Sequence, residues 1–281
     1  QGSEDRAVLV SVFQAIGRAG EIGNTTWDSL DWDGDNEHIA VDWGELKTGQ
    51  QYLMTFHPDA SDWVLCSFHA LACYLIMGPT AVRSSTAEAE ANYMFPSYVH
   101  LGDASTKVSN VLDKCRKSED NPKGVEGIPS GAASHSLRKS SFNAALLHPC
   151  VGLLEAICRG GWSFKGDSNS FLYLESLLHV TLAGKALANW RHPEQHVSAP
   201  TLAAIKTDTN RTQVDHFVQY LFHESVIAEK LELDGDMKKV RDVFAATLLM
   251  YYDDVLDDCG DTCLVIKKIH NAALECRVDF G

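Results

Sequence analysis

The residues best suited to chemistry in this chain of 281 residues are His135 and Arg138, which form a His-Ser-Leu-Arg step. Residues three apart on a helix share a face, so the imidazole and the guanidinium would lie one turn apart. A guanidinium presents a planar fork of donors that fits a phosphate, and an imidazole exchanges protons near neutral pH. The pair therefore suits phosphoryl transfer, although the step alone is also compatible with a surface or helix-capping role.

Further candidate residues follow this step along the chain. Trp162 comes directly after Gly160 and Gly161, and the aromatic run Phe171-Leu172-Tyr173 begins nine positions later. A tryptophan after two glycines is often a core anchor.

Two candidates precede the His-Ser-Leu-Arg step. Arg18 and Glu21 form an Arg-x-x-Glu step, which also fits an ordinary ion pair on one helix face. Lys47 stands in a polar turn between two predicted strands, the first covering residues 38–42 and the second residues 52–57. It is the only lysine before residue 107, and a lysine at a hairpin tip is usually just solvated.

The order and spacing of these features resemble a tyrosine recombinase catalytic domain, most closely the Crypton group of eukaryotic DNA transposons. The phrases SHSLRKSSFNAAL and RGGWS carry the resemblance, which extends from about Gly17 to Leu274. It implies a mainly α-helical fold with a small antiparallel β-sheet (α+β), the integrase catalytic-domain fold. It also implies DNA cleavage and rejoining through a 3′-phosphotyrosine intermediate.

The resemblance implies a role for each candidate residue. Arg18 and Arg138 would hold the scissile phosphate, and His135 would act as acid or base. Trp162 would donate its ring N–H to a phosphate oxygen, and Lys47 would protonate the leaving 5′ oxygen.

The position of the nucleophile departs from the family pattern. Most members place the tyrosine nine residues after the His or Trp, and this chain has Phe171 there. Tyr173 lies two residues further on, about 200° around a helix. Three interpretations stay open: a deliberate replacement of tyrosine by phenylalanine, a domesticated recombinase that has lost cleavage, or a local distortion that lets Tyr173 serve.

The expected partner is double-stranded DNA, with Lys139 and Lys165 as additional DNA-binding residues. The resemblance implies a homotetramer on paired DNA sites, a nuclear location, no metal and no cofactor. No apolar run reaches transmembrane length, so no membrane association is expected. The eight cysteines form no C-x-x-C pair, which favours reduced thiols inside a cell. A zinc site formed by Cys259, Cys263, His270 and Cys276 is a minor alternative.

Two domains are expected. The recombinase catalytic domain would cover residues 5–190, and a helical C-terminal extension packing on it would cover residues 191–281. The family's separate N-terminal core-binding domain would be absent, because only 17 residues precede Arg18.

The formal charge of −14 argues at first against DNA, whose phosphates normally need a basic surface. The acidic residues are concentrated at both ends, whereas residues 103–191 hold 11 basic and 8 acidic side chains, an excess of +3. Charge thus permits a DNA site without predicting one. Two alternatives remain: a domesticated, non-catalytic DNA-binding protein and an acidic helical interaction scaffold.

Overall fold

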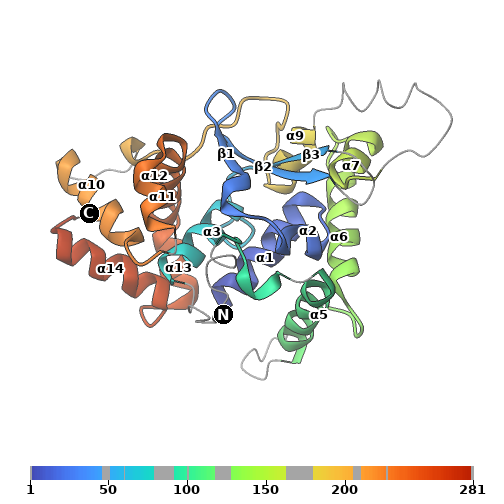
Figure 1. Ribbon diagram of the computed structural model, residues 1–281, viewed down its shortest axis with the longest axis horizontal. Helices are drawn as coiled ribbons and strands as arrows, with labels where there is room; N and C mark the ends of the chain where they lie inside the picture. Colours follow the sequence, from blue (N-terminus) through green and yellow to red (C-terminus); the bar gives the residue numbers. More distant parts are fainter. Residues whose placement is uncertain are drawn as a thin grey trace.

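The computed structural model is mainly helical with one small antiparallel sheet, which confirms the predicted α+β class (Figure 1). It describes residues 2–45, 51–59, 61–78, 92–99, 101–117, 128–162, 180–204, 210–225 and 227–279. Lys47, Lys165, Phe171 and Tyr173 lie outside the described residues.

The sheet has the order β1-β2-β3, with β1 at Leu30–Asp33, β2 at His38–Glu45 and β3 at Gln51–Phe56. The chain turns after Asp33, whose Oδ1 accepts the backbone N–H groups of Asp35 and Asn36, each at 3.0 Å. The first predicted strand corresponds to β2, which extends three residues beyond the predicted end at residue 42. It pairs in antiparallel orientation with β3, which follows residues 46–50 in the chain.

The centre of the core is α3 (Ser67–Ile76), a helix whose residues are all buried. A helix that is apolar on every side requires cover on every side. On one side α3 packs against α1 (Gly2–Ala15), which continues through a tight turn into the short α2 (Ala19–Gly23). Short 3-10 helices connect other described segments: η1 (Trp27–Ser29), η2 (Pro96–Tyr98) and η3 (Leu202–Ala204).

On the side of the molecule beyond α2 lie α5 (Leu101–Lys117), α6 (Ser134–Leu147) and α7 (Leu153–Arg159) (Figure 1). Next to them, α9 (Val180–Leu187) contacts α7 and β3. The helix with His135 and Arg138 ends at Leu147, shortly before Pro149, which cannot continue it. Contacts of α6 with α1, α5, α7 and α9 hold this helix in the molecule.

The opposite side holds α10 (Arg211–Phe222), α11 (Ala228–Leu233), α12 (Gly235–Met250), α13 (Tyr252–Cys259) and α14 (Leu264–Cys276) (Figure 1). Apolar residues recur at helical intervals over residues 214–231 and 237–256, and the structure divides the first stretch between α10 and α11 and the second between α12 and α13. Asp234 caps the start of α12 by accepting the backbone N–H groups of Asp236 and Met237.

The C-terminal helices share a core with the N-terminal half. Phe68 of α3 meets Phe244 of α12 edge to face at 5.9 Å, and both rings are fully buried. One continuous hydrophobic cluster joins α1, α3, α12 and α14. The predicted division at residue 190 stays a prediction. Among the described residues, no helix combines the length and apolar character needed to cross a membrane.

Candidate phosphate-binding site

A pocket of about 400 Å³ brings together three of the predicted site residues, Arg18, His135 and Arg138. It lies where the turn between α1 and α2 meets the N-terminal end of α6, with β2 and α5 completing the wall. Its volume lies within the usual range of small-molecule sites. Arg18 and Arg138 are 120 positions apart in sequence, so only the tertiary fold creates this cluster.

Arg18 is held at the pocket by Glu21. The Arg18 backbone N–H donates to Glu21 Oε2 at 2.8 Å, and Arg18 Nη1 pairs with Glu21 Oε1. The ion pair expected from the Arg-x-x-Glu step is therefore present, and it lies in the pocket wall. Behind it, Trp43 of β2 donates its indole N–H to Thr25 Oγ1 at 3.0 Å, which ties the sheet to the end of α2.

Arg138 is 4% exposed and is held from behind by the Gly-Gly-Trp segment. Its Nη2 donates to the Gly160 carbonyl, and its Cζ lies 4.2 Å from the centroid of the Trp162 ring. The surface role considered for this arginine is wrong, because packing with α7 and its following turn encloses the guanidinium. His135, one turn earlier, is exposed and lines the pocket, as the helical spacing predicts.

The two glycines before Trp162 have a geometric function. A Cβ on Gly160 would lie 2.0 Å from Cζ3 of the Trp162 ring, and Gly161 has a φ of +63°. Only glycine fits both positions without strain. The turn folds the tryptophan back over Arg138, and Phe142 meets the indole edge to face at 5.2 Å. Trp162 is not among the described residues that line the pocket, and its ring face packs against the Arg138 guanidinium.

The stacking of Trp162 on Arg138 leads to a stability prediction. Trp162→Leu removes the ring face from a buried cation, so we expect the free energy of unfolding to fall by about 1–2 kcal/mol. Trp162→Phe keeps a ring and should lose less. Urea unfolding of the two variants checks this, and equal losses would mean that the stacking itself contributes nothing.

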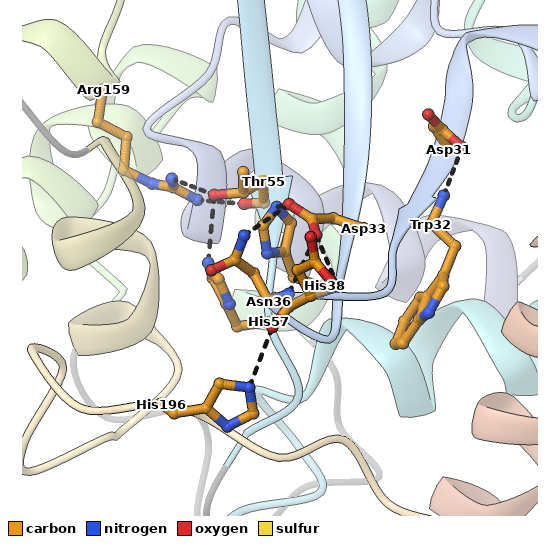
Figure 2. A network of polar contacts seen from close by, with 10 residues as sticks. Asp31, Trp32, Asp33, Asn36, His38, Thr55, His57, Arg159 and His196 are labelled. Carbon is orange, nitrogen blue, oxygen red and sulfur yellow. Dashed lines mark hydrogen bonds and ion pairs between the residues drawn. The ribbon is translucent and has the colours of Figure 1, made fainter.

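Behind Trp162, the fully buried Arg159 fixes the end of α7. Its Nε donates to the Gln14 carbonyl of α1 at 2.7 Å. Its Nη2 donates to the Thr55 carbonyl of β3 at 2.7 Å (Figure 2). A Cβ on Gly184 of α9 would lie 2.6 Å from Arg159 Nη1, so that glycine leaves room for the guanidinium. Arg159 directly precedes Gly160, and it therefore positions the carbonyl that holds Arg138.

Two buried histidines lie beside this arginine (Figure 2). The rings of His38 and His57 are 5.1 Å apart, and His57 Nε2 contacts Thr55 Oγ1 at 3.2 Å. Burial lowers the pKa of His57 well below its usual value, and the nearby His38 and Arg159 add to this. Burial also lowers the pKa of His38, although Asp33 opposes the shift. Both imidazoles are therefore neutral at pH 7.

The remaining predicted residues fall into two groups. Lys139 is exposed on α6, directly after Arg138. Lys47, Lys165, Phe171 and Tyr173 lie outside the described residues, so their predicted roles stay predictions. Within the described part of the chain, no three His, Cys, Asp or Glu side chains are grouped closely enough to hold a metal ion. This applies to the alternative zinc ligands as well.

Sequence reasoning missed three contributors to this site: Arg159, Ser105 and Ser134. The two serines line the pocket, and Arg159 supports it from behind. The only local signal was position, since Arg159 precedes the Gly-Gly-Trp segment and Ser134 precedes His135. Comparisons with protein-family models, curated proteins and solved structures find no significant match to this chain. The chemistry of the pocket therefore has to be inferred from its own residues.

Proposed function

We propose that the pocket binds a phosphodiester of double-stranded DNA and that the chain is a Crypton-like tyrosine recombinase. The observation that carries this proposal is the convergence of Arg18, His135 and Arg138 on one pocket. Two guanidiniums can neutralise the charge that develops on a phosphoryl group in the transition state. His135, exposed at the rim, is placed to exchange a proton with a reacting oxygen.

The balance of charge favours a diester over a monoester. The charged side chains of the pocket wall are Arg18 and Arg138 against Glu21 and Asp42, a formal sum of zero. A protonated His135 makes the sum +1, which matches the single negative charge of an internal DNA phosphate. A phosphomonoester carries up to two negative charges near pH 7, which this pocket would neutralise less completely.

The proposed reaction requires a tyrosine that attacks phosphorus and releases the 5′ oxygen. The family spacing places Phe171 at that position, and Tyr173 is the alternative nucleophile. Without a hydroxyl at the right place, the same pocket would bind DNA and not cleave it. A non-catalytic DNA-binding protein on the recombinase fold is therefore the second candidate, favoured by the phenylalanine at position 171.

The test is a suicide-substrate assay with nicked duplex DNA, followed by a denaturing gel that reveals covalent protein–DNA adducts. We expect an adduct with Phe171→Tyr that is lost on adding Arg138→Met to that variant, a loss of about 100-fold or more. Arg277→Ala is the matched control, because this exposed arginine follows α14 on the other side of the molecule from α6 (Figure 1).

The other outcomes separate the alternatives. An adduct from the unchanged chain that vanishes with Tyr173→Phe would make Tyr173 the nucleophile. DNA binding without any adduct, unaffected by Arg138→Met, would favour the non-catalytic protein. An absence of salt-dependent DNA affinity in all variants would reject both and leave the acidic helical scaffold.

A further inference from the structure

The pocket contains a pair of serine hydroxyls that its predicted chemistry does not use. Ser134 is the first residue of α6 and is only 9% exposed, and Ser105 reaches it from α5. Their hydroxyl oxygens are hydrogen-bonded to each other, and both residues line the pocket with Arg18 and Arg138. The pair therefore connects two helices at the place where a phosphate would sit.

The hydrogen bonds around this pair leave one of its two hydroxyl protons without an acceptor among the described residues. Ser109 donates its hydroxyl to the Ser105 carbonyl at 2.8 Å and accepts the Ser134 backbone N–H at 3.2 Å. These bonds use the neighbouring backbone groups and leave the two hydroxyls to pair with each other. Two hydroxyls carry two protons, and a single bond between them uses one. Within the described residues, neither hydroxyl has another polar partner, so the second proton lacks a protein acceptor.

The pair is partly buried and lines the pocket, so an anion bound there would supply the acceptor that the described protein groups do not provide. The surroundings favour an anion for a second reason. Ser134 opens a helix of 14 residues, so the partial positive charge of the α6 N-terminus adds to the charges of the arginines. A neutral donor also strengthens binding without raising the net charge of the pocket.

We propose that the Ser105–Ser134 hydroxyl pair is a third phosphate-binding group, which donates its spare proton to a non-bridging oxygen of the phosphodiester held by Arg18 and Arg138. This inference rests on the proposed phosphate-binding function of the pocket. The pair acts as a unit, because either hydroxyl can give the proton while the other accepts. Loss of one serine leaves one hydroxyl that can still donate to the phosphate.

The pair is tested with the dinucleotide thymidylyl-(3′→5′)-thymidine, which carries a single phosphodiester. Its affinity for the full chain is measured by NMR titration. The variants are Ser105→Ala, Ser134→Ala and the double variant. We expect the double variant to bind about 10-fold or more weakly, since hydrogen bonds to charged groups are among the strong ones. Each single variant should lose less than half of that effect on a logarithmic scale, so the two losses should not be additive.

Two controls separate the pair from its surroundings. Ser140→Ala removes an exposed hydroxyl from the same helix and should leave binding unchanged. Ser109→Ala breaks the hydrogen bonds next to the pair, and Ser109 is not one of the described residues that line the pocket. This variant should lose less affinity than the double variant.

The outcomes distinguish failure of this inference from failure of the proposed function. Wild-type affinity in the double variant, together with lost binding in Arg138→Met, would reject the serine pair and keep the phosphate site. Equal losses in the double variant and in Ser109→Ala would also reject it, because they indicate a structural role. No binding by the wild-type chain would reject the phosphate site and the serine pair together.

Discussion

Arg159→Met is expected to lower the free energy of unfolding by about 3–5 kcal/mol, the largest stability effect that we predict for a single side chain. The guanidinium is completely buried and donates to the carbonyls of Gln14 and Thr55, which belong to α1 and β3. Methionine fills much of the same space and cannot donate. Both carbonyls would then be buried without their present donor. Urea unfolding, followed by circular dichroism, measures the loss.

The matched control is Arg191→Met, a replacement at an exposed position a few residues after α9. It should change the free energy of unfolding by less than about 0.5 kcal/mol. The same experiment also tests the link from Arg159 to the pocket. Because Arg159 positions the Gly160 carbonyl that holds Arg138, the folded Arg159→Met variant should bind the dinucleotide more weakly than wild type. Unchanged stability would show that the buried network around Arg159 contributes little.

Acidification from pH 6.5 to about pH 4 is expected to lower the free energy of unfolding by on the order of 1–3 kcal/mol per pH unit. The cause is the group of buried histidines, His38, His57 and His69. Burial lowers the pKa of each, and it lowers the pKa of His69 to about 3. Below pH 6.5 the unfolded chain takes up protons that the folded chain excludes, so stability falls as the pH falls.

Asp59 acts in the opposite direction over part of this interval. Burial raises its pKa from 3.8 to about 6, so the folded chain holds a proton that the unfolded chain has lost. As the pH falls from about 6 toward 3.8, this group adds stability, and it offsets roughly one of the histidines. The net loss over that range should therefore be smaller than the three histidines alone would give.

The variant that checks this prediction is His57→Gln, because His57 is completely buried. The measurement is the slope of unfolding free energy against pH, and replacing His57 should reduce it by up to about 1.4 kcal/mol per pH unit. The same replacement at His270, exposed on α14, is the matched control. A slope in His57→Gln equal to that of wild type would show that this imidazole is not the source of the acid sensitivity.

The sequence by itself determined those features that depend on residues close together in the chain. The Asp33 turn follows from a short carboxylate that reaches the backbone N–H groups two and three positions later. The ion pair of Arg18 with Glu21 follows from their spacing of three. Likewise, the helical period places His135 and Arg138 on the same side of α6. Local geometry fixes all of these before any tertiary contact forms.

The tertiary structure alone decided which of these local features meet. Arg18 reaches the pocket of Arg138 only because α1, α5 and α6 pack together, and Arg159 contacts Gln14 across 145 positions of sequence. The Ser105–Ser134 pair likewise joins residues 29 positions apart. Burial and hydrogen bonding between distant segments have no period in the sequence, since they depend on which apolar faces cover each other. For that reason the sequence indicated the two arginines as candidate site residues. The residues that position them and complete their pocket could be identified only from the tertiary structure.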